Sequence, residues 1–194
     1  MRTKFLSMVL VCTLCLSMAV PATAAALPSD LETAAAYVRE RGIMAGDQNG
    51  NLNLDAGLNR AELAVLLTRL RGGLEELYAN TGYYEQGCKF TDVPAWAKLF
   101  VGYCVRNNLV AGYDALRYGA ADPVNPAAAC TVILRVCGVE DGEGSVWNYD
   151  TACSYAVSLG WIDESTAQAD IITRGEMAVL IYRAQTGARP GVPP

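Results

Sequence analysis

Three stretches of the chain place apolar side chains at the spacing of a helix with one buried face. In residues 63–70, leucines recur at intervals of three and four positions, which puts them on one side of a helix. Apolar residues fall at the same places in residues 129–136 and 177–184. A helix of this length cannot bury such a face by itself, so we expect the three helices to pack together.

Start signals stand directly before these predicted helices. Asn59 with Glu62, and Thr173 with Glu176, fit the capping box, in which the cap side chain accepts from the third amide and the glutamate reaches back. The pair Asn125–Pro126 gives a cap and a proline suited to the first helical turn. Glycines occupy the positions where helices are expected to end: Gly42, Gly72, Gly138, Gly160 and Gly187.

These helices belong to three copies of one helix–loop–helix unit. A shift of 66 residues matches the first copy to the second without a gap, for example Tyr37 to Tyr103 and Gly46 to Gly112. The third copy, which includes Tyr155, has a shorter loop. We therefore predict an all-α fold of three packed units, with a linker after each of the first two. Unit 1 is expected at residues 25–73, unit 2 at 88–138 and unit 3 at 145–187. The Pro/Gly tail at 188–194 is not expected to fold.

The first residues have the pattern of a secretory signal peptide at positions 1–24. Arg2 and Lys4 are followed by an apolar run at residues 5–20 and by the small residues Ala22-Thr23-Ala24. We expect cleavage after Ala24 and export of the remainder. A membrane anchor is the alternative, but the apolar run is shorter than the roughly 20 residues that span a bilayer. No later segment is apolar over that length, so no transmembrane segment is expected in the exported chain.

Charge argues against several classes of partner. Without the signal peptide the chain has 13 basic and 20 acidic residues, a net charge of about −7, and no basic tract. Nucleic acid and anionic lipid are therefore poor partners. An anionic ligand would need a local cluster of hydrogen-bond donors.

The residue types argue against catalysis. The sequence has no histidine, which excludes histidine-based triads and histidine metal sites. A carboxylate pair could hydrolyse a glycoside, but no motif places two acids together. Residues 47–55 resemble a calcium loop, yet their acids do not have the spacing that it needs, so we interpret them as a polar turn in which Asn and Gly supply unusual backbone angles. We expect no enzymatic activity, no cofactor and no metal.

Five cysteines remain after cleavage: Cys88, Cys104, Cys130, Cys137 and Cys153. Export permits disulfides, but the odd number leaves at least one thiol unpaired. The spacings match no zinc motif. We interpret most of the five as small core residues. One disulfide is compatible with this count, and the sequence does not identify its pair.

Three motifs resemble the S-layer homology family. Residues 90–97 (F-T-D-V-P-A-W-A) resemble the opening of such a repeat, F-x-D-V-x-x-x-W-A. Residues 42–62 resemble its G-I-x-x-G and T-R-A-E body, and residues 172–177 (I-T-R-G-E-M) resemble its T-R-x-E signature. The resemblance implies a pseudo-threefold bundle whose grooves bind anionic secondary cell-wall polymers, often carrying pyruvate ketals. It also implies a secreted location in the cell wall or S-layer.

The resemblance assigns two arginines to the site. The arginine of T-R-A-E is a main ligand contact in the family, and it corresponds to Arg60 in unit 1 and Arg174 in unit 3. From the residues alone, a guanidinium beside the free amides of a helix start forms a site for a carboxylate or phosphate. The alternative is that each arginine pairs with an acid of a neighbouring unit. Unit 2 has Pro126 in place of the arginine, so we expect its groove to be degraded.

Two further candidates come from the opening motif of unit 2. Asp92 and Trp96 are candidate polymer contacts, and the alternative is a helix cap and a core aromatic. Units 1 and 3 lack a clear copy of this motif. Asp30 stands where unit 1 would have the tryptophan, and Trp147 of unit 3 matches only loosely.

Two interpretations other than polymer binding stay open. A bundle of this kind can bind another surface protein, with Tyr83, Tyr84 and Trp161 either exposed for that purpose or packed in the ordinary way. The chain could also be a degenerate scaffold that no longer binds a glycan.

Overall fold

The computed structural model of the protein describes residues 28–139 and 145–187. Throughout these two stretches the only regular elements are helices, and two isolated bridges, Gly57 with Thr173 and Asn59 with Pro123, are the sole extended pairings. The all-α prediction is confirmed. The predicted signal peptide (1–24) and tail (188–194) lie outside the described residues, and so does most of the predicted second linker.

Nine α-helices and one 3₁₀ turn follow one another along the described chain. The longer helices are the second helices of the predicted units, together with α1 and α5. In order, the elements are α1 (Pro28–Glu40), α2 (Arg60–Leu70), α3 (Leu74–Ala79), α4 (Thr81–Gly87), α5 (Lys98–Arg106), α6 (Pro126–Val136), the 3₁₀ turn η1 (Tyr149–Thr151), α7 (Ala152–Ser158), α8 (Glu164–Ala167) and α9 (Arg174–Thr186). No helix in the described ranges combines the length and the hydropathy needed to cross a bilayer.

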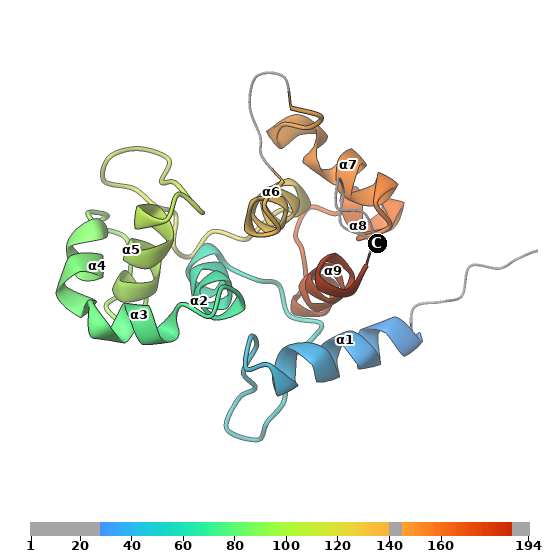
Figure 1. Cartoon of the computed structure of the whole chain (residues 1–194), viewed down its shortest axis with the longest axis horizontal. Coiled ribbons are helices and arrows are strands. Elements are labelled where there is room, and N and C mark those ends of the chain that lie inside the picture. Colours follow the sequence, from blue (N-terminus) through green and yellow to red (C-terminus); the bar gives the residue numbers. More distant parts are fainter. Residues whose placement is uncertain (1–27, 140–144, 188–194) are drawn as a thin grey trace, which may run out of the picture.

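Helices of consecutive units interlock in a cycle. The second helix of unit 1 (α2) packs against the first helix of unit 2 (α5), α6 of unit 2 packs against α7 of unit 3, and α9 of unit 3 packs against α1 of unit 1. Figure 1 shows α2, α6 and α9 nearly end-on at the centre, with their partners outside them. Each apolar helix face is therefore buried against a different unit, as a helix pair too small for its own core requires.

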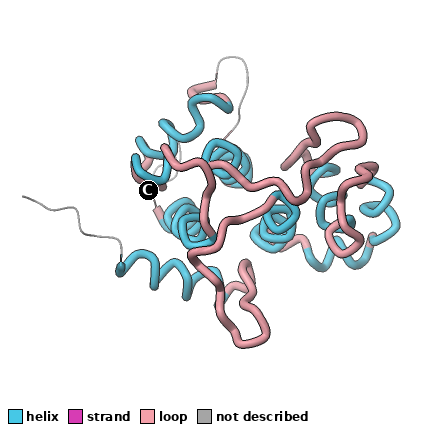
Figure 2. The backbone as a smooth tube through the Cα atoms, turned by 180° about the vertical axis from the view of Figure 1, so that it is seen from behind, coloured by secondary structure: helices cyan, strands magenta, loops and turns pink. Residues whose placement is uncertain are grey.

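A ring of three backbone hydrogen bonds closes this cycle. The amide of Leu58 donates to the carbonyl of Ile172 at 3.1 Å, Ile172 donates to Val124 at 2.9 Å, and Val124 donates to Leu58 at 2.8 Å. All three residues are buried, and each directly precedes the N-cap of a central helix. The ring therefore brings the starts of α2, α6 and α9 together on one face, where Figure 2 shows the loops converging.

The predicted helix starts are confirmed. The Asn59 side chain accepts from the amide of Glu62 at 2.9 Å, and the Glu62 carboxylate accepts from the amide of Asn59 at 3.1 Å. Thr173 and Glu176 form the same reciprocal pair at α9. Asn125 caps α6 by accepting from the amide of Ala128. Such caps typically contribute about 1 kcal/mol each.

The segment that links units 1 and 2 is helical and packed, which the sequence did not predict. Its residues form α3 and α4, and their side chains Leu77 and Tyr84 are buried. Helix α4 approaches α5 so closely that a Cβ added at Gly102 of α5 would lie 1.8 Å from the carbonyl oxygen of Tyr84. Burial of one large side chain from each short helix explains why neither is a free loop.

Two tryptophans occupy the core. Trp161 and Trp147 are both almost fully buried. The proposal that Trp161 forms a docking surface is therefore wrong, and ordinary packing explains it. Of the tyrosine pair, Tyr84 is buried and Tyr83 is exposed.

Candidate functional site

Arg174 reaches from the first residue of α9 into the loop of unit 1. Its Nε donates to the Leu52 carbonyl at 2.7 Å, and its Nη2 donates to the Ala45 carbonyl at 3.1 Å. Its backbone amide donates to the Ala56 carbonyl at 2.8 Å. Three donors of one residue therefore hold the loop that precedes α2.

Arg60 makes the equivalent contacts one unit further on. From the first residue of α2, its Nε donates to the Tyr118 carbonyl at 3.0 Å and its Nη2 donates to the Ala111 carbonyl at 2.8 Å. Its amide donates to the Asp122 carbonyl at 3.0 Å. Each acceptor lies 66 residues after its counterpart in unit 1. We call these three hydrogen bonds, from one arginine to the loop of the next unit, the clamp. The same clamp therefore joins unit 3 to unit 1 and unit 1 to unit 2.

Among the described residues, these partners contradict the alternative that each arginine pairs with an acid. Within the described residues, all acceptors of Arg60 and Arg174 are carbonyl oxygens, and no carboxylate pairs with either guanidinium. A carbonyl orients the guanidinium without cancelling its charge. Each guanidinium has five N–H donors, of which the carbonyls take two. Both side chains are half-buried, so charge and spare donors remain for another acceptor.

The clamp is missing where unit 2 meets unit 3. Pro126 begins α6 and has neither an amide hydrogen nor a guanidinium. The polar contact next to this position is an exposed one, from Asn125 Nδ2 to the Tyr149 hydroxyl at 3.2 Å. In unit 3 the shortened loop carries the small helix α8, which is capped by Asp163. The start of α6 therefore presents no cation.

Arg174 of unit 3 lines a cavity of about 230 Å³, whose other walls come from unit 1 and from Trp96 of unit 2. Arg69, Glu62 and Trp96 line the same cavity. The Glu62 carboxylate accepts from the Asn59 amide in the capping box, and in the described chain it forms no ion pair with Arg69 or Arg174. The walls thus hold two positive charges, one negative charge and an indole. The rest of the lining is apolar side chain or backbone: Ile43, Met44, Ala45, Leu58, Val65 and Leu66.

Arg69 was not proposed as a site residue from the sequence. Its repetition was visible, because Arg135 and Arg183 occupy the same place in units 2 and 3. The repetition alone did not show that the three environments differ. Arg183 pairs with Asp30 at 2.7 Å, whereas Arg69 faces the cavity that Trp96 lines.

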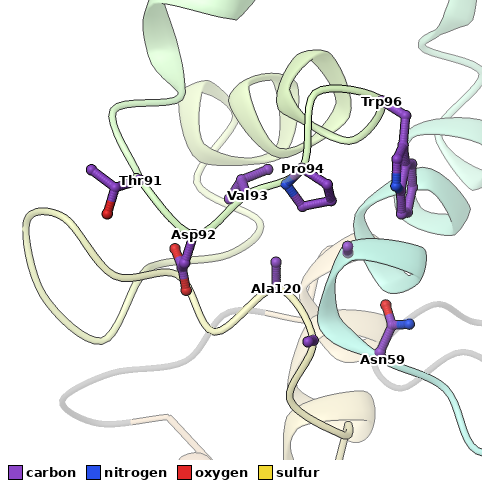
Figure 3. Close-up of a pocket in the computed structure, with 9 residues that line it drawn as sticks. Asn59, Thr91, Asp92, Val93, Pro94, Trp96 and Ala120 are labelled. Carbon is purple, nitrogen blue, oxygen red and sulfur yellow. The ribbon is translucent and has the colours of Figure 1, made fainter.

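Trp96 also lines a second cavity, of about 400 Å³, together with Asp92 and Asn59. Figure 3 shows Trp96 and Asp92 on opposite sides of this cavity, with Pro94 and Ala120 between them. The Trp96 side chain is 56 % exposed, so the alternative of a core aromatic is wrong. Its indole forms a wall between the two cavities.

Asp92 holds a loop and caps no helix. Its carboxylate accepts from the amide of Tyr118 at 2.8 Å and from the amide of Gly119 at 2.6 Å. These amides, that of Tyr118 foremost, stabilise the charged form and lower the pKa of Asp92 below its ordinary value of 3.8. The helix-cap alternative is therefore wrong, because both acceptor oxygens serve the loop that Arg60 also binds.

The structure brings only some of the predicted site residues together. Trp96 joins Arg174 in one cavity and Asp92 in the other, while Arg60 lines neither. The Arg60 guanidinium instead lies over the rings of Tyr118 at 4.6 Å and Tyr113 at 4.8 Å. Cation–π contacts with two rings therefore add to the carbonyl contacts of Arg60.

Two other cavities of about 600 Å³ have a different character. The one between α9 and α1 holds Arg183 with the carboxylates of Asp55, Asp163 and Glu176, which disfavours an anion. The other, at the carboxyl ends of α2, α5 and α6, is lined by Arg71, by Arg135 and by residues 107–111, with no aromatic side chain in its walls.

The predicted calcium-like loop is a polar turn. The Asp47 carboxylate accepts from the amides of Asn49 at 2.8 Å and Asn51 at 3.0 Å. Gly50 and Asn53 have positive φ angles of 80° and 52°. Asn and Gly thus supply the unusual backbone angles, as the sequence indicated.

Comparison with known proteins links the chain to bacterial cell surfaces. No protein-family model matches the sequence. The chain is 28 % identical over 171 residues to the middle cell wall protein of Brevibacillus brevis, a match that covers 84 % of this chain and 15 % of that protein. It is 30 % identical over 128 residues to the surface layer protein of Brevibacillus choshinensis, covering 64 % of this chain and 11 % of that protein. These similarities indicate a secreted protein associated with the cell wall or surface layer, and the chain spans a small part of the curated relatives that it matches.

Proposed function

We propose that the protein is a non-catalytic surface anchor of the S-layer homology type, which binds an anionic cell-wall polymer beside Trp96. The observation that carries the proposal is that Arg174 and Arg69 line one cavity with this exposed indole, while no carboxylate of the described chain pairs with either guanidinium. The cell-wall and surface-layer relatives support the location that this function needs.

Arg174 is held in place before any ligand arrives. Two carbonyl acceptors fix its guanidinium, so binding an anion costs little additional side-chain entropy. A carboxylate or phosphate can accept from the remaining N–H donors, and such charge-assisted bonds are stronger than bonds between neutral groups. Arg69 adds a second positive charge in the same cavity.

The two cavities beside Trp96 suit different parts of a charged glycan. The cavity of about 230 Å³ that contains Arg174 is small enough to select a charged substituent, such as a carboxylate-bearing ketal. The cavity of about 400 Å³ on the other side of the indole has room for an adjoining sugar. The exposed indole between them offers an apolar face against which a sugar ring can pack.

A sedimentation assay tests this function. The protein is mixed with wall sacculi that keep their secondary polymer and with sacculi from which acid has removed it. We expect the protein to sediment with the first and stay in solution with the second, and we expect about 0.5 M salt to weaken the binding because it screens charges. Equal sedimentation with both preparations, or binding that salt leaves unchanged, contradicts the proposal.

A further inference from the structure

The contact between units 2 and 3 lacks the clamp that joins the other units. Arg60 and Arg174 each donate three hydrogen bonds to the loop of the next unit. Pro126, at the equivalent place, can donate none of them. The contact between α6 and α7 therefore needs another source of stability, and the exposed bond between Asn125 and Tyr149 is a weak substitute.

Two thiols meet at this same contact. Cys130 lies on α6 and is 1 % exposed, and Cys153 lies on α7 and is half-buried. The two helices pack against each other, and the two side chains are within hydrogen-bonding reach. At the equivalent positions the other two contacts have small or apolar residues without a thiol: Ala64 with Val101, and Ala178 with Ala35. The paired cysteines thus occur only where the clamp is absent.

Two other cysteines, Cys104 and Cys137, contact residues of α2 and α9. Cys104 contacts Thr68 and the carbonyl of Ala64 on α2. Cys137 contacts Gln185 and the carbonyl of Ala184 on α9. These contacts are with hydroxyl, amide and carbonyl groups, whereas Cys130 and Cys153 lie within hydrogen-bonding reach of each other.

We propose that Cys130 and Cys153 form a disulfide in the exported protein and cross-link unit 2 to unit 3. The oxidant is a disulfide of a small molecule or of a thiol oxidoreductase. The thiolate of Cys153, which solvent reaches, attacks that disulfide, forms a mixed disulfide and releases one thiolate of the oxidant. The thiolate of Cys130 then attacks the Cys153 sulfur and releases the second thiolate. The protein loses two thiol protons, which pass to the two released thiolates, and the oxidant is reduced to two thiols.

The environment sets the rate of this reaction. Burial raises the pKa of the Cys130 thiol and, to a smaller extent, that of the Cys153 thiol. Since the thiolate is the reacting form, oxidation is slow at neutral pH and accelerates as pH rises. Once formed, the link restricts the unfolded chain between α6 and α7 and raises the melting temperature by roughly 5 °C.

Peptide mapping of the full chain tests the proposal. The protein is incubated with oxidised glutathione, remaining thiols are alkylated, and the unreduced protein is cleaved after arginine and glutamate. Such cleavage separates Cys130, Cys137 and Cys153 into three peptides. We expect the peptides of Cys130 and Cys153 to be joined and the peptide of Cys137 to be alkylated. Alkylation of both proposed partners, or a link from either one to any other cysteine, overturns the proposal.

Three variants connect the link to the stability of the contact. Cys130→Ala and Cys153→Ala introduce the residue that equivalent positions already contain, so we expect both to fold. Reduction should lower the melting temperature of the oxidised wild type by roughly 5 °C and leave these two variants unchanged. Cys137→Ala, at the C-cap that directly follows α6, is the control variant and should behave as wild type. A reduction-dependent shift in Cys153→Ala, or none in the linked wild type, contradicts the proposed role.

Discussion

The backbone amide of Leu58 donates to the carbonyl of Ile172, which lies 114 positions later in the sequence. This bond joins the residue before α2 to the residue before α9, and Val124 completes the ring with the residue before α6. Because the three helix starts are fixed to one another, Arg174 and Arg60 reach the loops of neighbouring units at the same geometry. The position of the candidate site therefore depends on the closure of all three units.

The clamp predicts that charge alone cannot replace arginine. Arg174→Lys keeps the positive charge but cannot donate from two nitrogens to the carbonyls of Leu52 and Ala45. We expect a loss of about 1–2 kcal/mol in the free energy of unfolding. We also expect faster amide hydrogen exchange in residues 45–56. Arg69→Lys, which removes no such contact, is the control, and equal effects of the two changes would argue against the clamp.

The contact between α4 and α5 predicts a strong steric effect. A Cβ at Gly102 would lie 1.8 Å from the Tyr84 carbonyl oxygen, so Gly102→Ala should cost roughly 1–3 kcal/mol of unfolding free energy. Gly82 lies on α4 with nothing within 4 Å of its added Cβ. Gly82→Ala should therefore be neutral or slightly stabilising. Urea unfolding measures both, and a wild-type value for Gly102→Ala would disprove the close approach.

The hydrogen bonds of the Asp92 carboxylate should make the stability of the folded protein depend on pH in the acid range. Its pKa in the folded protein is lowered, first by the amide of Tyr118. A lowered pKa means that the stabilisation is present above the ordinary value of 3.8 and is lost as the pH falls through the folded value. Between about pH 5 and about pH 3, the melting temperature should fall less steeply in Asp92→Asn than in wild type. Asp170→Asn, on the exposed surface, is the control for loss of one carboxylate. Parallel curves for wild type and Asp92→Asn would refute this role.

Trp96 offers a direct optical probe of the site. Trp147 and Trp161 are 2 % and 1 % exposed, whereas Trp96 is 56 % exposed. Acrylamide should therefore quench mainly the fluorescence of Trp96, and Trp96→Phe should remove most of the quenchable signal. Purified wall polymer should protect the wild-type signal from quenching because it covers the indole. Quenching that the polymer does not change would place the binding elsewhere.

Local features of the fold could be predicted from the sequence. The capping pairs of Asn59 and Thr173 use residues three positions apart, and the apolar stripes use spacings of three and four. Both are visible without knowledge of the tertiary structure. The short helices α3 and α4 were missed because each buries one large side chain, Leu77 or Tyr84, and one such residue makes no periodic pattern.

The partners of the site residues could not be predicted in the same way. Arg174 binds a carbonyl 122 positions away, and any residue presents a carbonyl, so the side-chain sequence has no signal for it. The acceptor role of Asp92 depends on two amides 26 and 27 positions away. Arg69 and Arg183 look alike in the repeats, but Asp30 pairs with Arg183 while Arg69 lines the cavity beside Trp96. Repetition identified the equivalent positions, and packing gave them different roles.

The most direct test of the polymer site compares Arg69 with its counterpart Arg183. Calorimetry measures the Kd of purified wall polymer for wild type, Arg69→Gln and Arg183→Gln. Neither residue belongs to the clamp, and the two occupy equivalent helix positions. We predict that Arg69→Gln weakens binding roughly tenfold, since it removes a charge-assisted contact, while Arg183→Gln leaves the Kd within about twofold of wild type. Equal Kd values for wild type and Arg69→Gln, with both proteins folded, would contradict the assignment of the site to the cavity beside Trp96.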